Sequence, residues 1–420
     1  MTDKIKVLTL GDMPFCPSGV GTQSKYVFEA LLETGKFSIV SLGGAVKHPS
    51  TDPIKTEQWG DDWIVYPVNG FGNADIVRSI IRNMRPDILW FMTDPRYFEW
   101  LWIMSDEIRP LMPMVYYHVW DNYPYPKFNK PWYLSNDKVV TISKVTQDIV
   151  ETVCPEVDSE YLPHAVNEEI FKKAENKDII EKMRKENFPN WENDKFLFFW
   201  NNRNARRKMS ASVIWWFKKF LEEVGNDKAC LLMHTDPLDP NGPNLNAVLS
   251  ELNLTNGEVL FSTNKIPPEQ MAMIYNMVDC TINVSDAEGF GLATLESLSC
   301  GTPIIVNMTG GLQEQITDGE KWFGEAIYPK AKAIVGAQNV PYIYEDRITE
   351  EDFVNALKKI YYTPRSELKD IGKDGMEYVR KNYNFSTFKK RWVETMLKVH
   401  EKHGSWDTRK NYKAWELIEV

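Results

Sequence analysis

Cysteine and histidine are scarce in this chain, and neither occurs in a pattern that is typical of metal binding. The five cysteines are far apart and form no C-x-x-C pair: Cys16, Cys154, Cys230, Cys280 and Cys300. Among the six histidines, only His400 and His403 have a spacing that resembles a metal site, and they have no obvious third ligand. The sequence therefore predicts no disulfide scaffold and no structural zinc, and this cysteine usage is typical of a reducing compartment.

Long apolar segments are also lacking. The longest apolar runs have about five or six residues, whereas a helix needs about 20 to cross a bilayer. Residues 1–4 lead directly into a short apolar run, without the apolar region of a signal peptide. We therefore expect a soluble, cytoplasmic protein with no integral membrane segment.

A positive net charge is absent as well. The 420 residues include 49 basic and 59 acidic side chains, which gives a formal net charge of −10. This balance argues against a protein whose main task is to coat nucleic acid or an anionic membrane. Residues 386–413 are an exception, with eight basic and three acidic side chains and with apolar residues at helical spacing. This stretch is either a helix that packs on the rest of the chain or a contact for a membrane surface or nucleic acid.

Short apolar runs alternate with amphipathic segments along the chain. At about 150 residues per domain, the length suggests two or three domains. In the first part we predict strands at 5–10, 37–42, 63–68, 87–92, 114–119 and 139–143, and helices at 22–34, 73–85, 96–108 and 144–153. Strands that alternate with helices in this way form a parallel sheet covered on both faces.

The stretch 164–195 differs from what precedes it, because charged residues replace the apolar runs. We interpret its start as the crossover to a second domain. Strands are then predicted at 196–201, 230–235, 259–262, 280–285 and 303–307, with helices at 210–224, 244–253, 268–277 and 292–300. Residues 349–403 have a helical pattern throughout. The sequence therefore predicts two successive doubly wound units, whose ligands bind beyond the carboxyl ends of the strands.

Residues 286–319 contain the strongest candidate site. Gly289 and Gly291 lie between a predicted strand and a helix that begins near Leu292, where free backbone N–H groups can hold a phosphate. Glu288 and Glu296 are eight residues apart on either side of this turn. Two carboxylates that flank an anion-binding turn can accept hydrogen bonds from sugar hydroxyls. The alternative is a glycine turn with two solvated glutamates.

This segment resembles the E-x7-E motif of the family-four retaining glycosyltransferases, which have the GT-B fold. Three further sets of residues match the usual pattern of that family: Cys300-Gly301-Thr302-Pro303, Gly310-Gly311-Leu312, and the pair Arg203 and Lys208 after the strand 196–201. Arginine offers a planar fork and lysine a point charge, and both suit a diphosphate leaving group. The alternative for the pair is a solvated basic turn with Arg206 and Arg207.

The resemblance implies which residues bind the donor and which act in catalysis. The implied donor-binding residues are Gly19, Gly21, Arg203, Lys208, Gly289, Phe290, Gly291, Leu292 and Glu296. The implied catalytic residues are Glu288, His118, Arg203 and Lys208. The loop with Gly19 and Gly21 lacks the adjacent Gly-Gly pair that is common in the family. A dinucleotide dehydrogenase would instead need G-x-G-x-x-G directly after the first strand, and only these two glycines are present.

Other residues at predicted strand ends depart from the family or leave alternatives open. The family often has a histidine at the place of His118, near the transferred sugar, but a structural histidine is also possible here. His164 stands where the family has an Asn-Gly turn, and His234 either lines the nucleotide side or is structural. Loops that face the acceptor in this architecture carry Tyr97, Trp120, Asp121 and Tyr123. Their aromatic rings either stack on a sugar or a base or pack in the core.

The resemblance also implies an architecture. It predicts a GT-B protein with two Rossmann-like, doubly wound domains that face a cleft. Residues 1–165 would form the acceptor domain, joined by the helices of about 386–420, and residues 166–385 the donor domain. The last helix would return to the first domain.

The implied activity is transfer of a hexosyl or pentosyl group from a nucleoside diphosphate sugar, such as a UDP- or GDP-sugar, to an acceptor hydroxyl. Anomeric configuration would be retained, and neither a metal nor another cofactor is expected. The acceptor is left open among a glycan, a lipid, a small molecule and a DNA base, and so is the oligomeric state. The alternatives are an enzyme that modifies a hydroxymethylated nucleic-acid base, a non-catalytic nucleotide-sugar or glycan binder, and a dehydrogenase.

Overall fold

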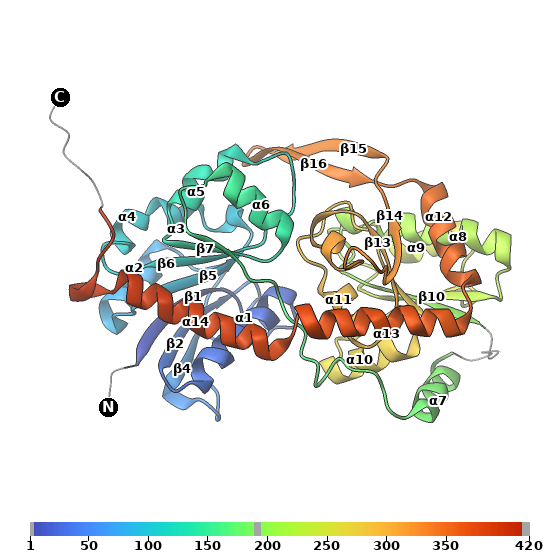
Figure 1. Cartoon of the computed structure of the whole chain (residues 1–420), viewed down its shortest axis with the longest axis horizontal. Coiled ribbons are helices and arrows are strands. Elements are labelled where there is room, and N and C mark those ends of the chain that lie inside the picture. Colours follow the sequence, from blue (N-terminus) through green and yellow to red (C-terminus); the bar gives the residue numbers. More distant parts are fainter. Residues whose placement is uncertain (1–3, 189–194, 414–420) are drawn as a thin grey trace. The chain divides into compact units, whose positions relative to one another are not determined.

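The computed structural model describes residues 4–188 and 195–413, and Figure 1 gives the order of its elements along the chain. The chain divides into two compact units. Unit 1 contains Met1–Ala165, Gly336–Tyr342 and Ser386–Val420, and unit 2 contains Val166–Val335 and Ile343–Phe385. Residues 1–3 and 414–420 of the predicted first domain, and residues 189–194 of the charged stretch 164–195, lie outside the described residues.

Unit 1 contains an eight-stranded sheet in the order β3-β4-β2-β1-β5-β6-β7-β8. Its strands are β1 (Ile5–Asp12), β2 (Phe37–Gly44), β3 (Ile54–Lys55), β4 (Trp63–Pro67), β5 (Ile88–Thr93), β6 (Met114–His118), β7 (Lys138–Thr141) and β8 (Ser159–Tyr161). All neighbours are parallel except β3 and β4. The six predicted strands are confirmed. Strands β3 and β8 were not predicted, because two or three residues without an apolar run give no pattern.

The helices of unit 1 differ from the prediction at the start of α1 and over residues 96–108, and α5 was not predicted. They are α1 (Gly19–Glu33), α2 (Ala74–Met84), α3 (Glu99–Ile103), α4 (Ser105–Ile108), α5 (Lys130–Leu134), α6 (Lys144–Val153) and α14 (Phe385–His403), whose first residue belongs to unit 2. Helix α1 begins before the predicted residue 22, because Ser18 caps it through the N–H of Gly21 at 2.9 Å. The predicted helix 96–108 was wrong as a single helix, because the backbone leaves helical geometry at Met104.

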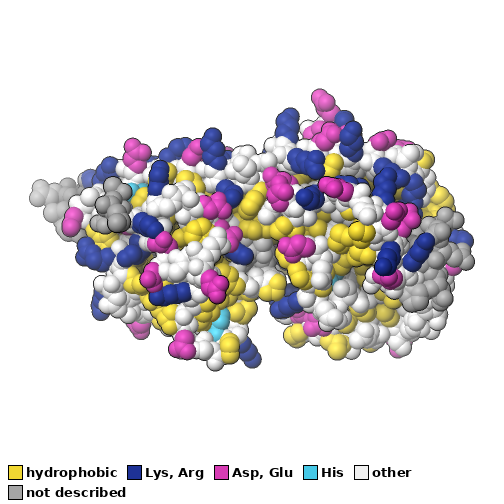
Figure 2. Space-filling view, turned by 90° about the horizontal axis from the view of Figure 1, so that it is seen from below, with side chains coloured by type: hydrophobic (Ala, Val, Ile, Leu, Met, Phe, Trp, Pro, Cys, Tyr) yellow, Lys and Arg dark blue, Asp and Glu magenta, His cyan; other side chains and the backbone are white. Residues whose placement is uncertain are grey.

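Helix α14 packs into the core of unit 1. The ring of Trp392 is fully buried, and it meets the rings of Trp90 and Tyr117 with centroids 5.9 and 4.8 Å apart. Its basic side chains form ion pairs with acidic residues of the same unit: Lys389 with Glu33, Arg391 with Glu160, and Lys402 with Asp158. The basic stretch therefore has a structural partner within unit 1. Figure 2 shows basic and acidic side chains mixed over the face in view.

Unit 2 contains a six-stranded parallel sheet in the order β11-β10-β9-β12-β13-β14. Its strands are β9 (Phe196–Asn201), β10 (Ala229–His234), β11 (Val259–Ser262), β12 (Cys280–Asn283), β13 (Ile304–Asn307) and β14 (Gly324–Ile327). The five predicted strands are confirmed and β14 was not predicted. Apolar side chains such as Phe198 and Trp200 on β9 are fully buried in its core. The strand order reverses between β9 and β12, and such switch points are where doubly wound sheets bind ligands.

The helices of unit 2 cover both faces of this sheet (Figure 1). They are α7 (Lys177–Asn187), α8 (Ser210–Val224), α9 (Leu245–Leu252), α10 (Pro268–Met277), α11 (Leu292–Ser299), α12 (Glu350–Tyr362) and α13 (Arg365–Asn382). Helices α8, α9 and α12 pack together, and so do α7, α10, α11 and α13. The predicted helical stretch 349–403 is therefore three helices, α12, α13 and α14. Helix α7 lies in the charged stretch 164–195, after the start that we interpreted as the crossover, and it buries none of its side chains.

A hairpin of β15 (Ala331–Ala337) and β16 (Val340–Arg347) forms a separate two-stranded sheet between β14 and α12 in the chain. Its strands are largely polar or exposed, and we did not predict it. Short 3-10 helices complete the structure at Gly60–Asp62, Pro95–Tyr97, Lys127–Asn129, Arg206–Lys208, Gly310–Glu314 and Trp406–Thr408. Among the residues described, no helix is long and apolar enough to cross a membrane.

Candidate functional site

A row of polar residues lies at the carboxyl end of the unit 2 sheet. Five neighbouring strands, β11, β10, β9, β12 and β13, end in Ser262, His234, Asn201, Asn283 and Asn307. The N-terminal halves of β9, β10 and β13 are apolar and buried. The sheet therefore changes from apolar core to hydrogen-bonding groups at the edge where parallel sheets bind ligands.

Lys208 and Glu288 form an ion pair at the switch point. Lys208 follows β9 and Glu288 follows β12, so adjacent strands bring together two residues that are 80 positions apart. The side chains are 10% and 12% exposed. Asn283 also donates a hydrogen bond of 3.2 Å to the Glu288 carboxylate. We predicted both members of the pair as site residues, but not their contact.

The ion pair keeps Glu288 ionised. Burial alone would raise the pKa of its carboxyl, but the opposite charges of Lys208 and Arg207 and the hydrogen bonds from Lys208 and Asn283 lower this pKa to about 2. The carboxylate is therefore charged throughout the physiological range. A buried anion held by fixed partners is suited to interact with a centre that gains positive charge.

Glycine residues allow the loop after β12 to pack tightly against the segment after β13. Gly310 has a φ of +48°, and a Cβ there would overlap the carbonyl oxygen of Glu288. The N–H of Gly311 donates to that same oxygen at 3.0 Å. Gly291, with a φ of +93°, is the N-cap residue before α11 and has no side chain to cap that helix. The backbone at the start of α11 therefore offers the geometry expected of a phosphate site.

Glu296 has a different environment from Glu288. Its Oε2 accepts a hydrogen bond of 2.9 Å from the hydroxyl of Tyr275, which in turn accepts one of 2.9 Å from Asn201. Burial raises the pKa of the Glu296 carboxyl to about 7, although the bond from Tyr275 acts in the opposite direction. Two carboxylates whose pKa values are driven apart are typical of separate roles in one site. Sequence reasoning missed Tyr275, because it lies 21 positions before Glu296 on another helix.

The other predicted residues of this site occupy varied positions. Arg203 is an ion-pair partner of Asp239, with 2.6 Å between Nε and Oδ2, and its side chain is 66% exposed. Arg207, which we did not predict, donates to the carbonyl oxygen of Ala287 beside Glu288. Phe290 is buried with its ring 5.8 Å from that of Tyr383. Gly289 lies in the loop before α11, and Leu292 is the first residue of that helix.

In unit 1, the predicted glycines lie at the start of α1. Gly19 is its first residue and is exposed, whereas Gly21 is buried in its first turn. A Cβ at Gly21 would lie 2.8 Å from the carbonyl oxygen of Met13, so a side chain does not fit there. Ser18 caps the helix and also donates to Asp12 at 2.6 Å.

His118 lies at the end of β6, as predicted, but its side chain is fully buried. Nε2 is 2.9 Å from the hydroxyl of Tyr133. Burial lowers the pKa of His118 to about 3, so the imidazole is neutral at pH 7. His164 has the same character, with Nδ1 2.7 Å from the hydroxyl of Tyr117 and a pKa of about 3. These environments are typical of structural histidines.

The predicted acceptor-side residues differ in exposure. Tyr97 is 50% exposed and its ring lies 4.8 Å from that of Phe71. Trp120 is 5% exposed and donates to the carbonyl oxygen of Asn122. Tyr123 donates to Asp148 at 2.6 Å, and Asp121 is partly buried. Tyr97 therefore offers an accessible ring, whereas Trp120 belongs to the packing of unit 1.

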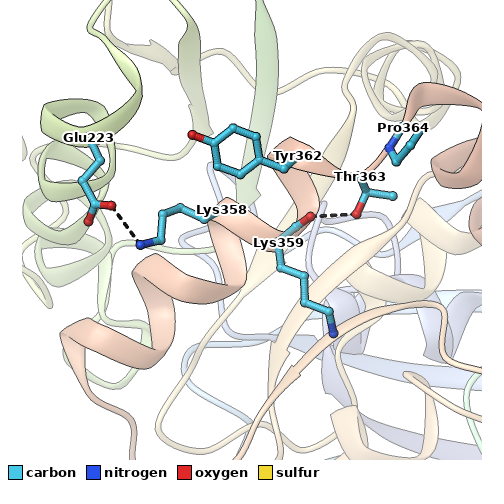
Figure 3. Close-up of a pocket in the computed structure, with 6 residues that line it drawn as sticks. All are labelled: Glu223, Lys358, Lys359, Tyr362, Thr363 and Pro364. Atoms are coloured by element: carbon cyan, nitrogen blue, oxygen red, sulfur yellow. Dashed lines mark hydrogen bonds and ion pairs between the residues drawn. The ribbon is translucent and has the colours of Figure 1, made fainter.

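A separate pocket lies at the end of α12 (Figure 3). It is lined by Glu223, Lys358, Lys359, Tyr362, Thr363 and Pro364, all outside the predicted site. Both lysines form ion pairs with glutamates, Lys358 with Glu223 and Lys359 with Glu325. The cationic groups of this pocket are therefore already compensated, and we assign it no role.

Comparison with known proteins connects this geometry to a family. Residues 182–360 match the family described as glycosyl transferases group 1. A 76-residue segment is 37% identical to D-inositol 3-phosphate glycosyltransferase of Acidothermus cellulolyticus, covering 18% of this chain and 16% of that protein. A 193-residue segment is 26% identical to alpha-monoglucosyldiacylglycerol synthase of Streptococcus pneumoniae, covering 46% of this chain and 42% of that protein. The chain thus matches less than half the length of either relative.

Solved structures extend the likeness of the fold to nearly the whole chain. Sucrose-phosphate synthase from Thermosynechococcus elongatus superposes with a TM-score of 0.74 at 15% identity, covering 95% of this chain and 100% of that one. The Anabaena protein HepE, solved with UDP and glucose, superposes with a TM-score of 0.69 at 16% identity, covering 94% of this chain and 100% of that one. The chain therefore has the predicted GT-B fold, and its residues 182–360 match the glycosyl transferases group 1 family.

Proposed function

We propose that the chain is a glycosyltransferase that moves a hexosyl or pentosyl group from a nucleoside diphosphate sugar to an acceptor hydroxyl, with retention of anomeric configuration. The observation that carries this proposal is the buried pair of Lys208 and Glu288 at the switch point of the unit 2 sheet. Both residues lie within the segment that matches the glycosyl transferases group 1 family, residues 182–360.

In the proposed reaction, the bond between the anomeric carbon and the diphosphate oxygen breaks, a bond to the acceptor oxygen forms, and the proton of the acceptor hydroxyl passes to the departing diphosphate. Negative charge grows on the leaving diphosphate while the sugar ring becomes positive. Lys208, Arg203 and the backbone at residues 289–292 would stabilise the diphosphate, and electrostatic stabilisation of this kind usually accounts for most of the rate enhancement. Glu288 would hold the sugar and Glu296 the ribose. No metal or other cofactor enters this proposal.

The predicted catalytic role of His118 has no support in its environment. A neutral, fully buried imidazole that is bonded to Tyr133 has the features of a packing residue. The proposal therefore assigns the chemistry to unit 2 residues and keeps His118 as a residue of the unit 1 core.

A UDP-sugar is the donor that we favour over a GDP-sugar. HepE has been solved with UDP and with UDP-glucose, and this supports a uridine nucleotide for a chain of the same fold. The relatives are described as an inositol-phosphate glycosyltransferase and a glucosyldiacylglycerol synthase, so a small-molecule acceptor and a lipid acceptor both stay within the proposal. We propose a cytoplasmic location.

A nucleic-acid acceptor is less favoured by the structure. The basic stretch 386–413 suggested it, but the ion pairs of Lys389, Arg391 and Lys402 within unit 1 account for much of that charge. Trp120, one of the aromatic residues considered for base stacking, is buried.

A panel of nucleotide sugars tests the proposal. A ligand at 100 times its Kd adds about 2.7 kcal/mol of stability, so thermal shift with UDP- and GDP-sugars would identify the donor. Proton NMR of the anomeric signal would then follow donor consumption and the configuration of the product. Donor binding without turnover for any sugar, lipid or small-molecule acceptor would favour a non-catalytic binder, and an inverted product would contradict retention.

A further inference from the structure

The hairpin β15–β16 ends beside the candidate site. Residues 345–347 are the last three of β16, and they belong to unit 2, whereas the hairpin tip Gly336–Tyr342 belongs to unit 1. We refer to Glu345, Asp346 and Arg347 as the hairpin foot. Each of the three contacts a different part of the loops that follow β9, β12 and β13.

Glu345 binds the loop after β9. Its carboxylate accepts hydrogen bonds from both terminal nitrogens of Arg206, one of them at 2.8 Å, and one of 2.9 Å from Arg347. The Glu345 side chain is 4% exposed, so this fork is desolvated on the carboxylate side. Arg206 is two residues before Lys208 in the same 3-10 turn. The foot therefore holds the turn that carries the lysine of the site.

Asp346 connects the loops after β12 and β13. Its N–H donates to the carbonyl oxygen of Asp286 at 2.9 Å. Its side chain accepts a bond of 2.7 Å from the hydroxyl of Thr309. The amide of Asn307 donates both to the carbonyl oxygen of Ser285 at 2.9 Å and to that of Asp346 at 3.2 Å. These bonds fix the segment before Glu288 and the segment before Gly310 to one strand end.

Arg347 forms an ion pair with Asp286, at 2.7 Å between Nη1 and Oδ2. The Asp286 side chain is 1% exposed. Burial raises the pKa of its carboxyl to about 7, and the nearby charges of Arg347 and Arg206 oppose this rise. The N–H of Asp286 also donates to the carbonyl oxygen of Arg207 at 2.8 Å. Asp286 thus joins the foot to the loops of both Lys208 and Glu288.

We propose that the hairpin foot, Glu345-Asp346-Arg347, positions the three loops of the donor site and sets the spacing of Lys208, Glu288 and Gly310 for the nucleoside diphosphate sugar. The three loops come from strands that lie on both sides of the switch point, and the foot bonds to all of them. This inference rests on the proposed function, because it assigns the site to a nucleoside diphosphate. The foot residues are positioning residues, since they act through the residues that they bond, Arg206, Asp286 and Thr309.

The physical reason for such an element is the cost of ordering. Loops that must be ordered by the ligand lose binding energy to conformational entropy, whereas loops already held by buried hydrogen bonds do not. Sites with fixed supporting bonds bind and react more effectively than sites whose supports are loose. Weakening the foot should therefore reduce nucleotide affinity while the sheet and helices stay folded.

Two near-isosteric substitutions test this on the full chain. Glu345→Gln removes the charge that holds Arg206, and Thr309→Val removes only the hydroxyl that bonds Asp346. Binding of UDP and of GDP would be measured by calorimetry well below the melting temperature of each variant. For whichever nucleotide binds the wild type, we expect Glu345→Gln to raise Kd about 5- to 50-fold and Thr309→Val about 3-fold.

Matched controls come from the same unit and appear in part in Figure 3. Glu325→Gln removes the charge that pairs with Lys359, and Thr363→Val removes the hydroxyl that donates to the carbonyl of Lys359 at 2.7 Å. Both controls should leave Kd within about twofold of the wild type. A substitution that affects only global stability does not change the affinity of the folded protein, so affinity separates positioning from a merely structural role.

The possible outcomes are distinct. Unchanged affinity in folded Glu345→Gln and Thr309→Val would overturn the inference and leave the proposed function intact. Should Glu345→Gln not fold, Thr309→Val alone decides in the same way. A wild-type chain that binds neither UDP nor GDP would refute the proposed donor site, and the role of the foot with it. If the two control variants lost as much nucleotide affinity as Glu345→Gln and Thr309→Val, the inference would also be overturned.

Discussion

The hydroxyl of Tyr275 donates a hydrogen bond of 2.9 Å to the carboxylate of Glu296. Tyr275 is fully buried on α10, and Glu296 lies on α11. The side-chain amide of Asn201, at the end of β9, in turn donates a hydrogen bond of 2.9 Å to the Tyr275 hydroxyl. Burial and the charge of Glu296 raise the pKa of the Cys300 thiol, so this thiol stays neutral at pH 7. The orientation and the charge of Glu296 therefore depend on a residue that lies outside the E-x7-E segment.

Substitution of Tyr275 by Phe should weaken nucleotide binding and shift its pH dependence. The Glu296 pKa of about 7 lies above its usual value, so the carboxyl loses its proton as pH rises through 7. Only the charged form accepts hydrogen bonds with both oxygens, so UDP affinity should increase between pH 6 and pH 8. Tyr275→Phe removes a hydrogen bond that favours the charged form of Glu296. The midpoint of the rise in UDP affinity should therefore move to higher pH.

Calorimetric titration of UDP across this pH range measures the effect, with the exposed Tyr362→Phe as the control. Glu296→Gln cannot titrate at this position and should lose the part of the pH dependence that Glu296 contributes, while the titration of Asp286 and of the terminal phosphate of UDP is left. An identical pH profile in wild type and Tyr275→Phe would contradict the assignment.

The two glutamates should separate in kinetics. Glu296 is assigned to the ribose, which contributes equally to the ground state and the transition state, so Glu296→Gln should mainly raise the donor KM. Glu288 is assigned to the transferred sugar, and its negative charge interacts more strongly with that ring as the ring becomes positive in the transition state. Glu288→Gln should therefore lower kcat about 10- to 1000-fold. Loss of free UDP binding in Glu288→Gln but not in Glu296→Gln would reverse the assignment.

Removal of either cationic side chain should weaken the binding of free diphosphate, with unequal effect. Lys208 is buried and paired with Glu288, so Lys208→Met removes a desolvated charge and leaves a buried carboxylate without its main partner. Arg203 is 66% exposed, and solvent screens its charge, so Arg203→Met should cost less. We expect about 100-fold and about 5-fold increases in the Kd of UDP, respectively. Equal affinities in Arg203→Met and the wild type would remove Arg203 from the donor site.

The pH dependence of stability tests the environment of His118. Its pKa is about 3 in the folded chain, against about 6.5 in an unfolded chain. The unfolded state therefore binds an extra proton between these values, and the stability that is present above pH 6.5 is lost as pH falls. Between pH 7 and pH 5.5, His118 should reduce the free energy of unfolding by about 1 kcal/mol. Urea unfolding of wild type and His118→Gln at both pH values measures this, and equal pH dependence would contradict burial of a neutral ring.

The sheets could be predicted from the sequence, because most strands of a doubly wound sheet are buried on both faces. The runs that became β5 and β9 are continuous apolar stretches bounded by polar residues. Strands β15 and β16 could not be predicted in this way, because they lie outside the main sheets and most of their residues are exposed or only partly buried. The hairpin foot was missed for the same reason.

The site could be predicted only where its residues are close together in the chain. Glu288, Gly291 and Glu296 share one loop and helix, so their spacing carries a signal. The partners of these residues come from other strands and helices, and no spacing connects Tyr275 with Glu296 or Lys208 with Glu288. The burial of a single side chain also cannot be predicted from the sequence. His118 stands at a strand end that suits a functional residue, and only the fold shows that its ring is enclosed.

Substitution of Gly310 by Ala should disable the site without unfolding the chain. A Cβ at Gly310 would overlap the carbonyl oxygen of Glu288, and because that oxygen is backbone, the whole loop must move. We expect kcat to fall at least about 10-fold through displacement of Glu288. Gly319→Ala is the matched control, since Gly319 also has a positive φ, +98°, but a Cβ there would have no atom within 4 Å. Both variants place an L residue at a positive φ, so melting temperatures compare the strain in the two variants while kcat reports the clash at Gly310. Equal kcat values in the two variants would show that the contact between Gly310 and Glu288 does not matter for the reaction.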